Sequence, residues 1–262
     1  MGTHSVGLGW IKDLLDKRDF TAAALNLPTT PPPTSDDRKW IAAILDQDGL
    51  GSCVAQATCQ AIRARQWFQT GGATAPELTS RFYVWWHCRN QTGDAARNAG
   101  TYIRTAFKLM NGTPGRPPER LWPQVLTDID LPRPTYARKP PPSVLAAGFD
   151  KRKAEYNRVT EIGAARIPVI KQLIADHRFP VFGTMVDIPF TYADGPDYHI
   201  MPPTGIVFAG GHAMLGAAYD AEGVWVPNSW GKGWRRGGWA HLAWEYFAWD
   251  QTDDIWGVKL IG

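Results

Sequence analysis

Four residues in three short motifs have the types and the order that acyl transfer by a cysteine requires. Gln47 and Cys53 stand at the two ends of a glycine-rich loop. His212 follows two glycines, and Asn228 lies sixteen residues beyond it. Together they provide a thiol nucleophile, an imidazole base, an amide that orients the base and a second amide that can receive negative charge. The sequence therefore predicts a thiol-based catalytic site.

Cys53 stands where a nucleophile is best activated. It follows the glycine loop and opens a run without Gly or Pro that extends to Phe68, which predicts a largely buried helix over 53–68. The start of a helix favours thiolate over thiol. A single cysteine there would more often be a core residue, and only the other three residues favour the catalytic interpretation. We then expect the pKa of Cys53 to be well below those of Cys59 and Cys88.

The other three residues have matching roles. Gln47 lies six residues before Cys53, so its side-chain amide and the backbone N–H of Cys53 can donate to the same oxyanion. We expect His212 and Asn228 on adjacent antiparallel strands, where they share a face only if the turn has an odd number of residues or a bulge. Asn228 would fix the imidazole tautomer, and Trp230 could cover that hydrogen bond from water.

The elements that position these residues change character along the chain. The first half reads as helical and the second half as strand-rich, which is an α+β pattern. A proline-rich stretch over 114–142 predicts little regular structure. The expected helices are 53–68, 77–88, 102–110 and 164–177, and the expected strands are 181–186, 206–219, 224–228 and 238–243.

Composition narrows the function classes. The chain has 262 residues, 44% of them hydrophobic, and a scattered net charge of +3, which fits one globular domain and gives no support for a nucleic-acid partner. No signal peptide or membrane span is apparent. Three cysteines are too few for a disulfide framework, so we expect reduced thiols and a cytoplasmic location. No cofactor or metal is expected.

At the motifs Gln-x-Gly-x-Gly-Ser-Cys, Gly-His-Ala and Asn-Ser-Trp-Gly-x-Gly-Trp, the chain resembles the papain-like cysteine peptidases. From about residue 8 onward it resembles a bacterial and phage-type branch with a short N-terminal segment. The resemblance implies a two-lobed fold with a helical N-terminal lobe (about 46–130), an antiparallel β-barrel-like C-terminal lobe (about 165–262) and the active site in the cleft between them. The catalytic domain would be 36–262, after an N-terminal extension and proline-rich connector over 1–35.

The resemblance also suggests substrate contacts and reveals departures. Gly100 would belong to the wall that pairs with substrate backbone, and Tyr102 and Ala213 would line the pocket for the residue preceding the scissile bond. Val54 replaces a tryptophan that usually follows the nucleophile. His212 lies 159 residues beyond Cys53, against about 130–150 in the family, and an insertion over 132–150 would explain the surplus.

The N-terminal extension allows two interpretations. It has five apolar anchors that should pack against the domain if they can: Trp10, Ile11, Leu14, Leu15 and Phe20. The extension either lies along the back of the domain as permanent structure, or part of it occupies the cleft and restrains the enzyme.

Three functions are compatible with this site. The leading one is a cysteine endopeptidase that hydrolyses a polypeptide substrate through a Cys-His-Asn triad and a thioester acyl-enzyme. An amidase or a transpeptidase could use the same triad. The third is a non-catalytic papain-fold protein, associated with a virion or another larger assembly. Retention of all four catalytic positions argues against the third, because a pure scaffold needs none of them.

Overall fold

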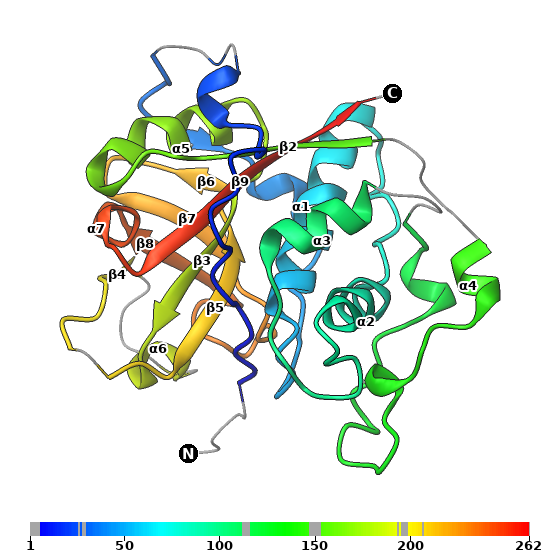
Figure 1. Cartoon of the computed structure of the whole chain (residues 1–262). Coiled ribbons are helices and arrows are strands. Elements are labelled where there is room, and N and C mark those ends of the chain that lie inside the picture. Colours follow the sequence, from blue (N-terminus) through cyan, green and yellow to red (C-terminus); the bar gives the residue numbers. More distant parts are fainter. Residues whose placement is uncertain are drawn as a thin grey trace.

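Two halves of different secondary structure lie side by side in the computed structural model of the chain (Figure 1). The structure describes residues 6–25, 27, 30–111, 116–146, 153–192, 194, 199–205 and 207–261. Helices α1 (Cys53–Thr70), α2 (Arg81–Gln91) and α3 (Ile103–Met110) form one half. Most strands lie in the other half, together with α5 (Arg166–Ala175) and α7 (Trp244–Ala248). The α+β class predicted from the sequence is confirmed.

Helix α1 is the central element of the helical half. Most of its side chains are buried, which explains why small alanines and uncharged polar residues replace the usual charged face. It ends at Gly71, whose φ of 58° is the left-handed conformation that glycine adopts at helix C-termini. Helix α2 begins later than predicted because Ser80 caps it, its hydroxyl accepting from the Tyr83 N–H.

The strands form two sheets among the described residues. The five-stranded sheet has the order β1-β6-β7-β8-β4 and the four-stranded sheet the order β2-β9-β3-β5. All neighbours are antiparallel except β4 and β8, which are parallel. The strands are β1 (Ser35–Asp36), β2 (Lys153–Arg158), β3 (Val181–Val186), β4 (His199–Ile200), β5 (Gly210–Leu215), β6 (Ala218–Tyr219), β7 (Gly223–Pro227), β8 (Trp239–Ala243) and β9 (Thr252–Ile261).

The prediction of one continuous strand over 206–219 is wrong. Residue 206 lies outside the described residues, residues 207–209 form no strand, and β5 and β6 follow as two strands of different sheets. The chain changes sheet at Gly216 and Ala217: the Gly216 N–H donates to Pro180 O, whereas the Ala217 N–H donates to Trp225 O. One continuous apolar run can therefore contribute strands to two sheets, because its first part pairs with β3 and its last part pairs with β1 and β7.

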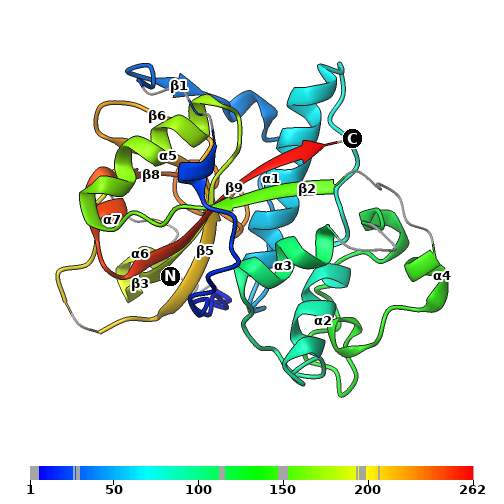
Figure 2. The same cartoon turned by 45° about the horizontal axis from the view of Figure 1, so that its top comes forward.

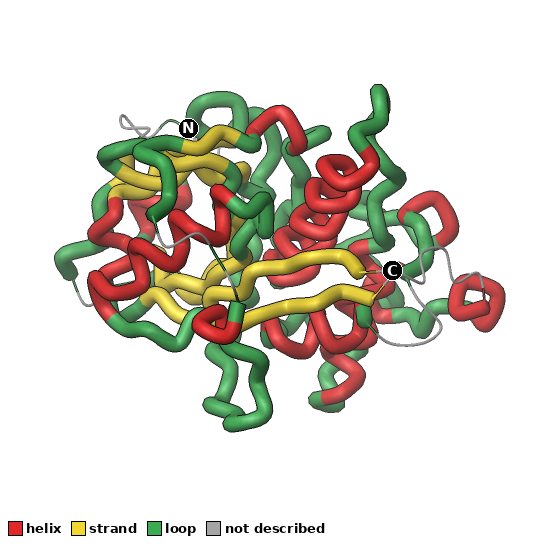
Figure 3. The backbone as a smooth tube through the Cα atoms, turned by 90° about the horizontal axis from the view of Figure 1, so that it is seen from above, coloured by secondary structure: helices red, strands yellow, loops and turns green. Residues whose placement is uncertain are grey.

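The longest strand, β9, was not predicted. It pairs with both β2 and β3, and the β2–β9 pair reaches across to the helical half, where it ends beside the C-terminus (Figure 3). Its start carries Asp253 and Asp254, which look unsuited to a strand. Asp254 is fully buried and forms a 2.7 Å ion pair with Arg158 of β2, so a distant cation compensates this charge.

Smaller elements complete the described chain. Helix α4 (Pro142–Ala146) lies in the region where we suggested an insertion, whereas residues 147–150 lie outside the described residues. Helix α6 (Ile188–Thr191) begins at Asp187, whose side chain accepts from the Phe190 N–H. All three cysteines are buried and free, as predicted. None of the helices in the described part of the chain combines the length and the apolar character needed to cross a bilayer.

Candidate active site

Cys53 is the first residue of α1 and its side chain has no exposed surface. The backbone N–H groups of Ala213, in β5, and of Gly9, in the N-terminal segment, lie near the thiol and favour its charged form. The nucleophile predicted from the sequence therefore lies at the junction of both halves, next to the residue that follows His212. Its position at a helix start agrees with the expectation.

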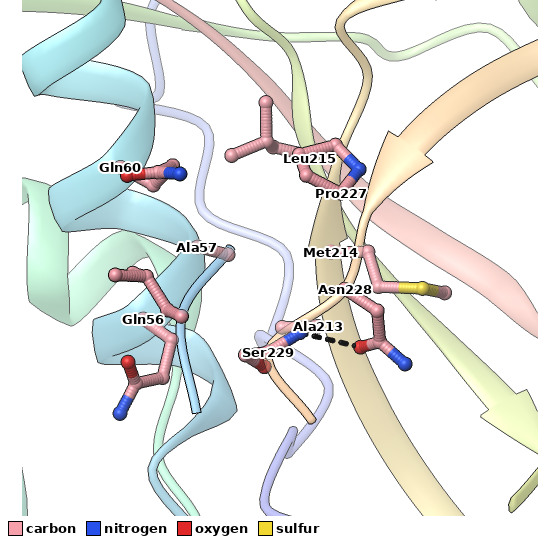
Figure 4. Close-up of a pocket in the computed structure, with 10 residues that line it drawn as sticks. Gln56, Ala57, Gln60, Ala213, Met214, Leu215, Pro227, Asn228 and Ser229 are labelled. Carbon is pink, nitrogen blue, oxygen red and sulfur yellow. Dashed lines mark hydrogen bonds between the residues drawn. The ribbon is translucent and has the colours of Figure 1, made fainter. Parts of the chain in front are cut away.

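His212 and Asn228 are directly connected. The imidazole Nε2 lies 2.7 Å from Asn228 Oδ1, and the same oxygen accepts the Ser229 N–H at 2.8 Å, the bond dashed in Figure 4. An oxygen that accepts both bonds requires a protonated Nε2, which leaves the lone pair of a neutral ring on Nδ1. Nδ1 is buried and has no hydrogen-bond partner among the described residues. Trp230 stacks on the imidazole with ring centroids 4.4 Å apart.

The route by which these two residues meet differs from the prediction. They do not lie on adjacent antiparallel strands: His212 lies in β5 of the four-stranded sheet, and Asn228 directly follows β7 of the five-stranded sheet. The two sheets face each other here, so neither a bulge nor an odd-residue turn is needed to bring the side chains together. The face-sharing argument assumed one sheet, which the local sequence could not exclude.

Gln47 is fully buried and its amide is held at both ends. Its Oε1 accepts from the Ser229 hydroxyl at 2.5 Å, which directs Nε2 the other way. Nε2 donates to the carbonyl oxygens of Leu50 at 2.7 Å and of Gly7 at 2.9 Å. Ser229 was not among the residues predicted for the site, although the Asn-Ser-Trp motif contains it. It contacts both Asn228 and Gln47 and so joins the two amides.

The N-terminal chain runs along the boundary between the two halves (Figures 1 and 2). We call residues 7–11 the closing segment. On the helical side, the Thr101 N–H donates to Gly9 O at 2.7 Å and the Ile11 N–H donates to Thr101 O at 3.0 Å. On the strand side, the Gly9 N–H donates to Gly211 O at 2.9 Å. The segment is therefore hydrogen-bonded to both walls of the cleft.

Two glycines permit this close fit. A Cβ on Gly7 would lie 1.8 Å from Leu50 O, and a Cβ on Gly9 would lie 2.1 Å from Gly51 O. Both obstacles are backbone atoms of the loop before Cys53, which cannot rotate away as a side chain could. Only glycine therefore allows the closing segment to lie this close to the nucleophile.

Trp10 anchors the closing segment. Its ring lies where a Cβ on Gly183 would be, its Nε1 donates to Asp254 Oδ2 at 3.1 Å, and the side chain is 8% exposed. The same carboxylate oxygen accepts the Asp13 N–H at 2.6 Å. For this part of the extension, the interpretation that it lies along the back of the domain is wrong.

The other apolar anchors of the extension do not all pack. Leu14, Leu15 and Phe20 are 82%, 91% and 71% exposed, so the expectation that they pack is wrong. The chain beyond the cleft is held by ion pairs instead. Asp19 accepts a 2.6 Å bond from Arg104, and Lys12 forms a 2.7 Å ion pair with Asp253.

Burial shifts the pKa values of both Cys53 and His212. It raises the pKa of the Cys53 thiol to about 11 and lowers the pKa of His212 to about 4, although the bond to Asn228 acts in the opposite direction on the histidine. Burial also raises the pKa of Cys88 to about 12. In this closed arrangement, burial acts against the low thiol pKa that we expected for Cys53 and favours the neutral forms of the thiol and the imidazole.

The residues suggested as substrate contacts lie at different depths. Gly100 faces the closing segment, since a Cβ there would lie 2.6 Å from Gly9 O. Thr101, not Tyr102, makes the hydrogen bonds to that segment, and Tyr102 is the N-cap of α3. Ala213 is 1% exposed and lines a cavity of about 10 Å³ behind the catalytic residues, between α1 and the strand-rich half (Figure 4). That cavity is too small for a substrate side chain.

A larger groove opens on the strand side of the closing segment. Its volume is about 370 Å³, and it begins beside Gly211, the residue before His212. The segment itself contributes part of the wall. The lining residues are Trp10, Ile11, Lys12, Met185, Gly211, Asp250 and Gln251.

Comparisons with known proteins show which solved structures the chain is similar to. No protein-family model matches the chain, and no curated protein sequence matches it. Among solved structures, the chain is similar to xylellain, a cysteine protease from Xylella fastidiosa, with a TM-score of 0.86 and 26% identity over 100% of this chain and 99% of that one. It is also similar to a procathepsin B from Trypanosoma congolense (TM-score 0.62, 13% identity, 98% and 87% covered).

A third similar structure is the bromelain protease from Ananas comosus in complex with the inhibitor E64 (TM-score 0.61, 16% identity, 88% and 100% covered). The matches with low identity show the papain-like fold. The match to xylellain along the whole of both chains further supports a papain-like cysteine peptidase, a hydrolase.

Proposed function

We propose that the chain is a cysteine endopeptidase that hydrolyses peptide bonds through Cys53, His212 and Asn228, with Gln47 as an oxyanion donor. The observation that carries the proposal is the 2.7 Å contact between His212 Nε2 and Asn228 Oδ1, which leaves Nδ1 as the basic atom, on a strand that packs against α1. A scaffold without catalysis has no need for an imidazole held in one tautomer beside a thiol.

The reaction would proceed in two steps. His212 Nδ1 takes the thiol proton, and Cys53 Sγ attacks the scissile carbonyl, whose oxygen becomes negative and is bound by Gln47 Nε2 and the Cys53 N–H. The C–N bond breaks, His212 returns the proton to the leaving amine, and a thioester remains on Cys53. Water, deprotonated by His212, then attacks the thioester and releases the acid and the thiol.

The closing segment must leave the cleft before a substrate can enter. In the closed arrangement, Gly7 O already accepts from Gln47 Nε2. The carbonyl oxygen of a substrate would need the same donor. We propose that opening also hydrates Cys53 and His212 and so converts the neutral pair into a thiolate–imidazolium pair. Gly100, Tyr102 and Ala213 remain candidates for substrate contact in the opened cleft.

The test compares the full chain with two variants on an unfolded protein and on internally quenched peptides. Gly9→Ala opens the cleft, and Cys53→Ala in that background removes the nucleophile. We expect Gly9→Ala to cleave internal peptide bonds and the double variant to be inactive with an unchanged melting temperature. Equal activity with and without Cys53 would contradict the proposal.

Two other readings predict different products. A transpeptidase would join an added amine to the acyl group in preference to water, and an amidase would cleave only simple or terminal amides. Mass spectrometry of the products separates these outcomes from internal cleavage. Absence of turnover by Gly9→Ala, with no thiol-specific labelling of Cys53, would favour the non-catalytic reading.

A further inference from the structure

Outside the candidate active site, three side chains of types that bind metal ions lie close together: two histidines and one glutamate. His199 lies in β4, Glu222 lies in the turn between β6 and β7, and His241 lies in β8. One ligand atom from each, an imidazole nitrogen or a carboxylate oxygen, lies within 4.8 Å of the other two. The Nδ1 atoms of His199 and His241 are only 2.7 Å apart. Three distant parts of the sequence thus bring lone-pair donors to one point.

Asp220 fixes the orientation of one ligand. Its Oδ1 lies 3.1 Å from His241 Nε2, so that nitrogen carries the proton and the lone pair of a neutral ring is on Nδ1, the atom directed at His199. The carboxylate is itself immobilised, because it accepts the N–H of Glu222 at 2.9 Å and the indole N–H of Trp225 at 3.2 Å. A carboxylate behind a histidine is the usual support of a metal-binding imidazole.

His241 is held in a buried environment, whereas His199 and Glu222 have room to adjust their positions. His241 is 1% exposed, and the Trp225 ring lies 4.7 Å from its ring. His199 is partly exposed on a two-residue edge strand, and Glu222 is exposed. Tetrahedral zinc with bonds of about 2.0–2.1 Å separates two nitrogen ligands by roughly 3.3 Å, so His199 would move out by only about 0.6 Å. A bound ion would replace the hydrogen bond between the two rings.

We propose that His199, Glu222 and His241 form a Zn²⁺ site in which Asp220 orients His241. Two imidazoles and one carboxylate suit Zn²⁺ and its substitute Co²⁺, whereas Mg²⁺ and Ca²⁺ prefer all-oxygen sites. The ion ties the edge strand β4 to β8 and to the β6–β7 turn, and so stabilises the sheet whose strand β7 leads to Asn228. Neither histidine belongs to a motif with metal-ligand spacing, so the sequence did not indicate this site.

The test uses the full chain with Cys53→Ala, because a catalytic thiol and imidazole would themselves bind these ions. We expect one Co²⁺ per chain with the visible absorption of a tetrahedral site, displaced by Zn²⁺. We also expect Zn²⁺ at a hundredfold excess over Kd to raise the melting temperature by roughly 5–10 °C. His199→Ala should abolish both effects, and Glu222→Gln should weaken binding. Asp220→Asn should weaken binding about 10–100-fold, as expected for a supporting residue.

Matched controls use residues of the same types elsewhere. His87→Ala and Glu245→Gln should leave Co²⁺ binding unchanged. Absence of tetrahedral Co²⁺ binding at micromolar concentrations would overturn the proposal. Binding of unchanged affinity in both His199→Ala and Glu222→Gln would overturn it equally, because the ion would then lie elsewhere.

Discussion

The side-chain amide of Gln47 donates to the carbonyl oxygen of Gly7 at 2.9 Å. The same amide is the donor that we propose for the oxyanion of the reaction, so in that proposal a carbonyl of the protein itself takes the position that a substrate carbonyl would need. The 2.5 Å bond from the Ser229 hydroxyl to Gln47 Oε1 directs the amide there. The donor is thus oriented before any substrate binds. The closing segment has to leave before a substrate carbonyl can accept from this donor.

Gly9→Ala should activate the enzyme. The added methyl group would lie 2.1 Å from Gly51 O and therefore expels the closing segment without touching a catalytic side chain. We expect peptidase activity to rise at least tenfold, measured as initial rates on a quenched peptide. Gly205→Ala is the matched control, because a Cβ there meets nothing within 4 Å. An activity of Gly9→Ala equal to that of the control would show that the segment does not restrain the enzyme.

Gln47→Ala should lower kcat roughly 10²–10³-fold and change KM little, because its amide binds charge that exists only in the transition state. The comparison belongs in the Gly9→Ala background, since loss of Gln47 also removes a bond to the closing segment. Steady-state kinetics over a range of peptide concentrations separates the two constants. A change confined to KM would mean that Gln47 only contacts the substrate.

Ser229→Ala should act through Gln47 as a positioning change. Loss of the hydroxyl leaves Gln47 Oε1 without its donor, and one such hydrogen bond is worth about 0.5–1.5 kcal/mol, or roughly 2–13-fold in kcat. In the presence of Gln47→Ala, the same substitution should have no further effect on kcat. Fully additive losses in this double-mutant cycle would show that Ser229 acts by another route.

Local motifs predicted the residues of the candidate active site, whereas their environment depends on distant partners. Cys53 could be placed at a helix start because the glycine loop and the run that follows are contiguous in the sequence. The strand β9 could not be predicted, because Asp254 becomes tolerable only beside Arg158. The path of the closing segment was equally inaccessible. It depends on contacts of Gly7 and Gly9 with residues more than forty positions away, and the sequence shows only two glycines.

The most direct measurement is the alkylation rate of each cysteine as a function of pH, followed by peptide mapping with mass spectrometry. In the full chain, burial raises the pKa of Cys53 to about 11, so its thiolate fraction and its rate should rise about tenfold per pH unit from pH 6 to 10. In Gly9→Ala, the thiolate–imidazolium pair should make Cys53 react rapidly even at pH 6, while Cys59 and Cys88 stay unreactive. Equal alkylation of all three cysteines at mildly acid pH, or a Cys53 rate in Gly9→Ala that still climbs tenfold per pH unit, would contradict the account.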